Sequence, residues 1–207
     1  MQSATIERQD TDFPGTKDRA ASTQSPIYLT DFTVCIDGLV EALEGRPEWD
    51  KYGARKAAYV HNRMSDIWVR YNAWENYNPK RGLKPFNNPH QSVWYPIVNK
   101  VPQLKRVVNE VLSHLSPVKL GGVLITKIPP GGSVMPHVDK GWHAKYYADK
   151  YAVQLKGNEQ QSFNFEGHSL STMPGEVFWF DNSQVHWVEN PSSQERMTMI
   201  ICTRSKH

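Results

Sequence analysis

Alternating apolar and polar residues dominate the second half of the chain. After Pro117, short runs rich in β-forming residues are separated by turn-forming pairs such as Pro174-Gly175 and Asn190-Pro191. Short strands at this spacing are typical of a β-sandwich or jelly roll. The pattern predicts strands over residues 122–128, 134–137, 151–155, 161–166, 168–173, 176–180, 185–190 and 196–203.

The first half of the chain is patterned mainly for helices. Apolar residues recur at helical spacing over residues 101–115, the clearest amphipathic segment, and over residues 31–44. Residues 65–71 alternate and contain β-forming residues, so they predict a strand. Residues 54–63 fit either a short helix or a loop.

This order of elements predicts an α+β protein that is mainly β. We expect a double-stranded β-helix, a jelly-roll or cupin-like core, with helices packed on one side. Residues 1–26 are polar and lack periodicity, so we expect a flexible tail. Residues 27–207 are expected to form a single domain, with a helical, substrate-side region at 27–116 and the jelly-roll core at 117–207.

The composition is that of an ordinary globular protein. Hydrophobic residues make up 39% and charged residues 22%, and the net charge of +3 does not lead us to expect a nucleic-acid partner. The two cysteines, Cys35 and Cys202, are expected to be buried free thiols, as suits a reducing cytoplasm. No apolar run is long enough to span a bilayer. We therefore expect a cytoplasmic protein, and nothing in the sequence indicates its oligomeric state.

One His-x-Asp pair and a distant histidine suggest a metal site. His137 and Asp139 are two residues apart, so on a strand they project to the same face, and His186 follows 49 residues later. Two histidines and one carboxylate are the ligand set of non-haem Fe(II) oxygenases, which leaves positions open on the metal. Each residue alone also has an ordinary interpretation: a loop histidine, a turn aspartate and an edge-strand histidine. Their joint occurrence in a β-rich segment favours the metal site.

Arg196 begins the last predicted strand, and Thr198 lies on the same face. An inward guanidinium can bind a carboxylate through two hydrogen bonds, and a neighbouring hydroxyl can add another. The alternative for Arg196 is a solvated arginine at the start of a strand. Thr126, Lys150 and Gln154 are further polar candidates for the cosubstrate, although Thr126 also fits an ordinary strand threonine and Lys150 a solvated loop lysine.

Three segments of the chain resemble the aspartyl/asparaginyl β-hydroxylase family of 2-oxoglutarate/Fe(II) oxygenases. They are the Pro-Gly turn leading to the first histidine (128–139), the glycine, apolar strand, Phe-Asp turn and second histidine (174–186), and Asn190-Pro191 followed by Arg196. The resemblance extends from about residue 65 to residue 204. It implies a hydroxylase that uses Fe(II), 2-oxoglutarate and dioxygen.

By this resemblance, His137 and His186 ligate iron and Arg196 pairs with the C5 carboxylate of 2-oxoglutarate. Thr126 falls where the family has a small hydroxyl residue that also contacts the cosubstrate. Two positions depart from the family pattern. Asp139 supplies a carboxylate that the best-known members lack, and Lys150-Tyr151-Ala152 stands where the family tends to have Arg-x-His.

The expected reaction is hydroxylation of an unactivated C–H bond in a peptide side chain, an amino acid or another small substrate. A non-catalytic cupin-like binding module and a nucleobase-directed oxygenase are the alternatives, and Arg196 favours an enzyme over a pure binding module.

Two loops are expected to cover the mouth of the site, at residues 72–96 and 140–149. Arg63 and Arg70 either face the substrate or are solvated, and His143 is not expected to be a ligand. The aromatic residues that could line the mouth are Trp94, Tyr95, Trp142, Tyr146 and Tyr147.

Overall fold

The computed structural model describes residues 25–53, 55, 61, 63–115 and 119–205. All but the last two residues of the predicted tail lie outside this part of the chain. The strands are β1 (Ile27–Thr33), β2 (Ser65–Tyr71), β3 (Val93–Trp94), β4 (Lys119–Ile128), β5 (Ser133–His137), β6 (Asp149–Lys156), β7 (Ser162–Phe165), β8 (His168–Leu170), β9 (Glu176–Phe180), β10 (His186–Glu189) and β11 (Arg196–Arg204). The helices are α1 (Leu39–Leu43), α2 (Leu83–Phe86), α3 (Ile97–Lys100), α4 (Gln103–Leu115) and α5 (Trp142–Tyr146), with a 3-10 turn, η2 (Trp74–Asn76).

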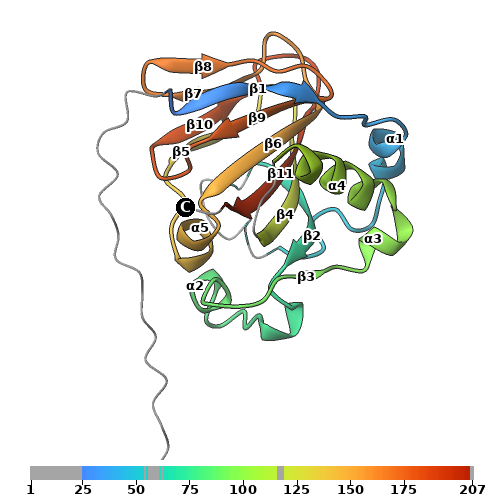
Figure 1. Ribbon diagram of the computed structural model, residues 1–207, viewed down its shortest axis with the longest axis vertical. Helices are drawn as coiled ribbons and strands as arrows, with labels where there is room; N and C mark the ends of the chain where they lie inside the picture. Colours follow the sequence, from blue (N-terminus) through green and yellow to red (C-terminus); the bar gives the residue numbers. More distant parts are fainter. Residues whose placement is uncertain (1–24, 54, 56–60, 62, 116–118, 206–207) are drawn as a thin grey trace, which may run out of the picture.

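The strands form two antiparallel sheets. The larger sheet has the order β1-β9-β6-β11-β4-β2-β3, and the smaller has the order β5-β10-β7-β8. Helices α1, α3 and α4 lie together on one side of the larger sheet, whereas α5 and α2 lie near the opposite end of the barrel (Figure 1). This arrangement confirms the predicted jelly-roll fold, mainly β with helices on one side.

Strand β11 separates two apolar cores by simple alternation. Met197, Met199 and Ile201 point into the core that α4 covers, and Ile200 packs with the second core between the two sheets. Arg196 also stands on the inner face, because residues two apart on a strand share a face. The strand therefore contributes apolar residues to the helix side and polar residues to the space between the sheets.

The helix predicted over residues 31–44 is wrong in its first half. Residues up to Thr33 belong to β1, which pairs with β9, and only Leu39–Leu43 is helical. The apolar spacing is genuine at Leu39 and Leu43, which are both fully buried. Most of β1 is exposed or half-buried because it lies at the sheet edge, so its alternation is too weak to mark it as a strand.

The other elements predicted within the described residues are found with small shifts of their ends, whereas the segment at 54–63 lies mostly outside the described residues. The helix at 101–115 is α4, and the strand at 65–71 is β2 with the same bounds. Strand β8 ends at Leu170, three residues earlier than predicted. Strands β1, β2 and β3 come from the region expected to be helical but belong to the larger sheet. The helical region and the jelly roll therefore share one sheet.

Two further expectations concern burial and membranes. Both cysteines are free, but Cys35 is exposed and only Cys202 is buried, so the expectation for Cys35 is wrong. Within the part of the chain that the structure describes, no helix has the length and apolar character needed to cross a membrane.

Candidate active site

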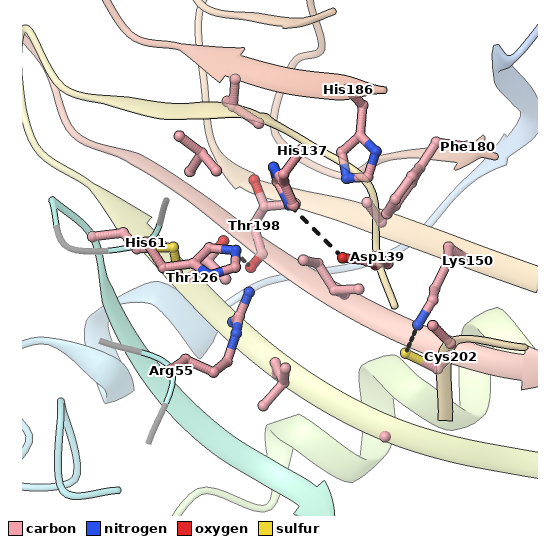
Figure 2. Close-up of a pocket in the computed structure, with 18 of the residues that line it drawn as sticks. Arg55, His61, Thr126, His137, Asp139, Lys150, Phe180, His186, Thr198 and Cys202 are labelled. Atoms are coloured by element: carbon pink, nitrogen blue, oxygen red, sulfur yellow. Dashed lines mark hydrogen bonds and ion pairs between the residues drawn. The ribbon is translucent and has the colours of Figure 1, made fainter. Parts of the chain in front are cut away.

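A cavity of about 590 Å³ opens between the two sheets. Its wall includes inward-facing residues of β4, β5, β6, β10 and β11, together with residues from α5 and from the segment before β2 (Figure 2). Cavities of this size are typical of sites for small ligands. The cavity contains nearly every polar residue that the sequence singled out.

His137, Asp139 and His186 meet in this cavity. Each offers one ligand atom, and these atoms all lie within 4.8 Å of one another; among the described residues, no other group of this kind is present. Nε2 of His137 lies 3.7 Å from Oδ1 of Asp139. The three side chains can hold one divalent metal ion, as their order in the sequence predicts.

The register of the smaller sheet brings the two histidines together. His186 on β10 is the direct partner of His137 on β5, and their ring centroids are 4.4 Å apart. The backbone N–H of Asp139 donates to the carbonyl of Asn182 at 3.1 Å, which ties the end of β5 to the turn before β10. His186, 49 positions after His137 in the chain, thus presents its donor to the same point as His137 and Asp139.

Hydrogen bonds fix the orientation of both rings. Nδ1 of His137 lies 2.8 Å from the carbonyl of Met135, and Nδ1 of His186 lies 2.9 Å from the carbonyl of Gln184. A carbonyl only accepts, so Nδ1 of each ring carries a proton, and Nε2 is the nitrogen that can face a metal. This tautomer is the one that a metal requires.

Nearby positive charge keeps Asp139 ionised. Burial by itself raises the pKa of the Asp139 carboxyl, but the positive charge of Lys150, with a smaller contribution from Arg55, outweighs burial and holds the pKa below its usual range. Burial likewise lowers the pKa of His186, so its ring is neutral. Both residues are therefore in the protonation state that metal binding requires.

Arg196 is a buried cation for which no salt-bridge partner is present among the described residues. Its side chain is 4% exposed, and Nη1 donates to Oγ1 of Thr198 at 2.6 Å. No salt bridge to Arg196 is present among the described residues, and burial lowers its pKa to about 10. Thr126 lies on the neighbouring strand, where its hydroxyl is 3.5 Å from the carbonyl of Thr198. The three residues line the cavity together and fit a carboxylate.

Comparison with known proteins identifies the family. The family model described as aspartyl/asparaginyl beta-hydroxylase matches residues 46–205. The chain belongs to the aspartyl/asparaginyl β-hydroxylase family. It is therefore a 2-oxoglutarate/Fe(II)-dependent hydroxylase that uses Fe(II), 2-oxoglutarate and dioxygen, and the candidate metal donors and the buried Arg196 fit these cofactors.

Solved structures agree with this hydroxylase in fold. An oxidoreductase of the 2OG-Fe(II) oxygenase family from Burkholderia pseudomallei matches with a TM-score of 0.51 at 13% identity, covering 81% of each chain. A viral collagen prolyl hydroxylase from Paramecium Bursaria Chlorella virus-1, in complex with 2OG, matches with a TM-score of 0.50 at 12% identity, covering 88% of this chain and 97% of that one. No curated protein sequence matches the chain.

Gln154 does not line the cavity of the hydroxylase. It is fully buried, and its amide N–H donates to the carbonyl of Met197 at 3.1 Å. Its side-chain oxygen accepts hydrogen bonds from Thr172 at 2.8 Å and from Thr198 at 3.4 Å. The sequence predicts that Gln154 contacts the cosubstrate. In the structure, Gln154 lies behind the cavity wall, where its hydrogen bond orients the hydroxyl of Thr198.

Lys150 lies in the cavity wall, as the sequence predicts, but with an unexpected partner. Its Nζ donates to Sγ of Cys202 at 2.9 Å, and both side chains are almost fully buried. Burial alone lowers the pKa of Lys150, yet Cys202 and the carboxylate of Asp139 outweigh it, so the pKa is raised. Lys150 is therefore charged inside the cavity.

Two residues of the site, Arg55 and His61, were not predicted. The Arg55 side chain points into the cavity and lies 3.6 Å from Oδ2 of Asp66, and the His61 ring stands edge-on to His137 with centroids 5.0 Å apart (Figure 2). Burial, followed by the positive charge of Arg55, lowers the pKa of His61 to about 3. No periodicity marks their segment in the sequence, so only the fold reveals them.

The two predicted loops contribute to the cavity wall, but not through the aromatic residues that were expected to line its mouth. Lys140 and His143 from one segment and Leu83 and Asn87 from the other line it. His143 is not free for a metal, since its Nε2 accepts a hydrogen bond from the backbone N–H of Gly122 at 3.0 Å. The predicted residues that are absent from the wall are Arg63, Arg70, Trp94, Tyr95, Trp142, Tyr146 and Tyr147.

We expect the His186→Ala substitution to abolish tight metal binding. It removes one of three donors, so the loss should exceed the roughly 10- to 100-fold that losing an outer-shell partner costs. Calorimetric titration of the metal-free hydroxylase with Mn(II) measures this loss. His168→Ala is the matched control, since His168 is exposed on β8. Equal affinity of the His186→Ala and wild-type proteins would contradict the metal site.

Acid should destabilise the metal-free hydroxylase through His143. Burial, then Lys150 and His90, lower the pKa of the His143 ring well below its ordinary value. The unfolded chain takes up a proton near pH 6.5 whereas the folded chain does not, so this contribution is complete at neutral pH and is lost as the pH falls. For one histidine kept neutral, the loss of unfolding free energy reaches about 2 kcal/mol at about pH 5.

Urea unfolding in a chelating buffer at both pH values measures this effect. We expect the acid-induced loss to shrink in His143→Gln and to remain unchanged in the exposed control His168→Gln. An equal loss in both variants would show that other groups cause it.

Proposed function

We propose that His137, Asp139 and His186 bind the catalytic Fe(II), and that Arg196 and Thr198 bind the C5 carboxylate of 2-oxoglutarate. The observation that carries the proposal is the placement of a buried, unpaired guanidinium in the same cavity as three metal-binding donors. A buried charge without a partner is costly, and a carboxylate ligand removes that cost.

Each residue has a defined task in this proposal. The two histidines and Asp139 hold the metal from one side and leave its other positions open. Arg196, supported by Thr198 and Thr126, orients the cosubstrate through its far carboxylate. When bound, iron with 2-oxoglutarate and dioxygen supplies the oxidation that converts a C–H bond into C–OH and releases succinate and carbon dioxide. The apolar wall keeps water away from this chemistry.

The substrate that we propose is a peptide side chain, an amino acid or another small molecule. The cavity of about 590 Å³ must hold both the cosubstrate and the reacting part of the substrate, which favours a small group. The net charge of +3 offers little support for the nucleobase alternative. Membership of a hydroxylase family disfavours the alternative of a non-catalytic binding module.

The Arg196→Met substitution should weaken binding of 2-oxoglutarate. Losing one partner of a buried charge pair costs about 2–5 kcal/mol, which corresponds to a roughly 30-fold or greater rise in Kd. Anaerobic calorimetry with Mn(II) in place of Fe(II) measures it without turnover. Arg63→Met is the control, since Arg63 is exposed and outside the cavity. An unchanged Kd in Arg196→Met would contradict the assigned role.

The substrate class can be tested by product mass. The enzyme is incubated with Fe(II), 2-oxoglutarate and separate small-molecule and peptide fractions of a cell extract. We expect a product heavier by one oxygen atom in one of these fractions, and no such product with His137→Ala. A product that appears only with added nucleic acid would favour the nucleobase-directed alternative instead.

A further inference from the structure

Lys150 and Cys202 form a nitrogen–sulfur pair in the cavity wall. Nζ and Sγ are 2.9 Å apart, and the side chains are 5% and 4% exposed (Figure 2). The two residues are direct partners in the antiparallel pairing of β6 with β11, so the backbone ladder holds them opposite each other. Their contact is therefore fixed by the sheet and does not depend on a loop.

This pair lies in the candidate active site. Both residues line the cavity that also holds His137, Asp139 and His186, which under the proposed function is where dioxygen is consumed. The other cysteine, Cys35, is exposed and accepts a hydrogen bond from Arg106 in a different part of the chain. Cys35 and Cys202 therefore form no disulfide with each other. An oxidised Cys202 sulfur therefore has the Lys150 amine, and no second thiol of the same chain, as its immediate neighbour.

We propose that Lys150 and Cys202 are a redox modification site, at which a peroxide converts their hydrogen-bonded contact into a reversible covalent nitrogen–sulfur bridge. Thiolates are the oxidisable form of cysteine, and the resulting sulfenic acids condense with thiols or with nitrogen. An amine at 2.9 Å is well placed for that condensation.

The chemistry balances in two steps. Cys202 releases its thiol proton to solvent, its sulfur attacks hydrogen peroxide, the O–O bond breaks, and the Lys150 ammonium gives a proton to the departing hydroxide. The products are a sulfenic acid, water and a neutral amine. The amine nitrogen then attacks the sulfenic sulfur, an N–S bond forms, the S–O bond breaks, and a second water leaves with the hydroxyl group and one amine proton. Sulfur is oxidised by two electrons and peroxide is reduced to water.

The bridge would change the electrostatics of the cavity. It replaces the Lys150 ammonium with a nitrogen that carries no positive charge, in the wall of the cavity that also holds the candidate metal ligands. The local charge on one side of the candidate metal site therefore depends on the oxidation state of Cys202.

Mass spectrometry of the full-length protein tests the site without turnover. The protein is reduced, placed in a chelating buffer that excludes iron, and treated with hydrogen peroxide. We expect the protein to become lighter by two hydrogen atoms through the bridge, and tryptic digestion to give one cross-linked peptide pair, uncut after Lys150 and joined to Cys202. Dithiothreitol should reverse the change.

Variants separate the bridge from other oxidation. Cys35→Ser should still form it, whereas Cys202→Ser and Lys150→Met should not. Cys202 gaining oxygen atoms while trypsin still cuts after Lys150 would overturn the proposal, and so would a Cys202 thiol that stays unreacted under peroxide. None of these results depends on the proposed roles of Arg196 or the metal ligands.

Discussion

The pairing of β5 with β10 is the constraint on which the site depends. His137 and His186 are opposite partners in this pairing, so one register places two imidazoles side by side at the mouth of the barrel. A slip of one residue would turn either ring to the other face of the sheet. The backbone bond from Asp139 to Asn182 closes the same corner and places the carboxylate beside the rings. The metal-binding geometry is therefore a property of strand register.

Strand β11 shows how one segment serves stability and chemistry together. Its outward residues fill the fully buried core under α4, which fixes the strand firmly. Its inward residues include Arg196, Thr198 and Cys202, all buried in the cavity wall. Burying cations is costly, and the chain meets that cost differently at Lys150 and Arg196, two buried cations of the cavity wall. Lys150 has Cys202 as an internal partner, whereas among the described residues Arg196 has the hydroxyl of Thr198 and no salt bridge, which fits the carboxylate ligand that we propose for it.

Local sequence was sufficient to predict the residues whose spacing follows from strand geometry. Arg196 and Thr198 share a face of β11 by alternation, so their placement could be read from the chain. Asp139 follows the end of β5, and its backbone hydrogen bond to Asn182 helps to hold it beside His137. Pairings between distant segments could not be predicted, which is why Cys202 was not linked to Lys150. Gln154 is on the same face of β6 as Lys150, but it is buried behind the cavity wall. The sequence pattern predicts the face of a strand on which a residue lies, but not how far along the strand the cavity extends.

Segments without periodicity were the least predictable. Arg55 and His61 enter the cavity from a stretch with no clear pattern, although both lie close to the candidate metal ligands. Strand β1 was predicted as part of a helix because the apolar residues of an edge strand are few and its stability comes from pairing with β9. In both cases, tertiary contacts rather than local preference determine the structure.

Release of succinate from 2-oxoglutarate tests the assignment of this cavity as the active site most directly. With Fe(II) and dioxygen present, the wild-type protein should form succinate, and direct binding of 2-oxoglutarate should accompany it because turnover without substrate can be slow. His137→Ala should form none above the background of free iron. Equal background succinate from both proteins, together with no binding of 2-oxoglutarate by either, would contradict the assignment.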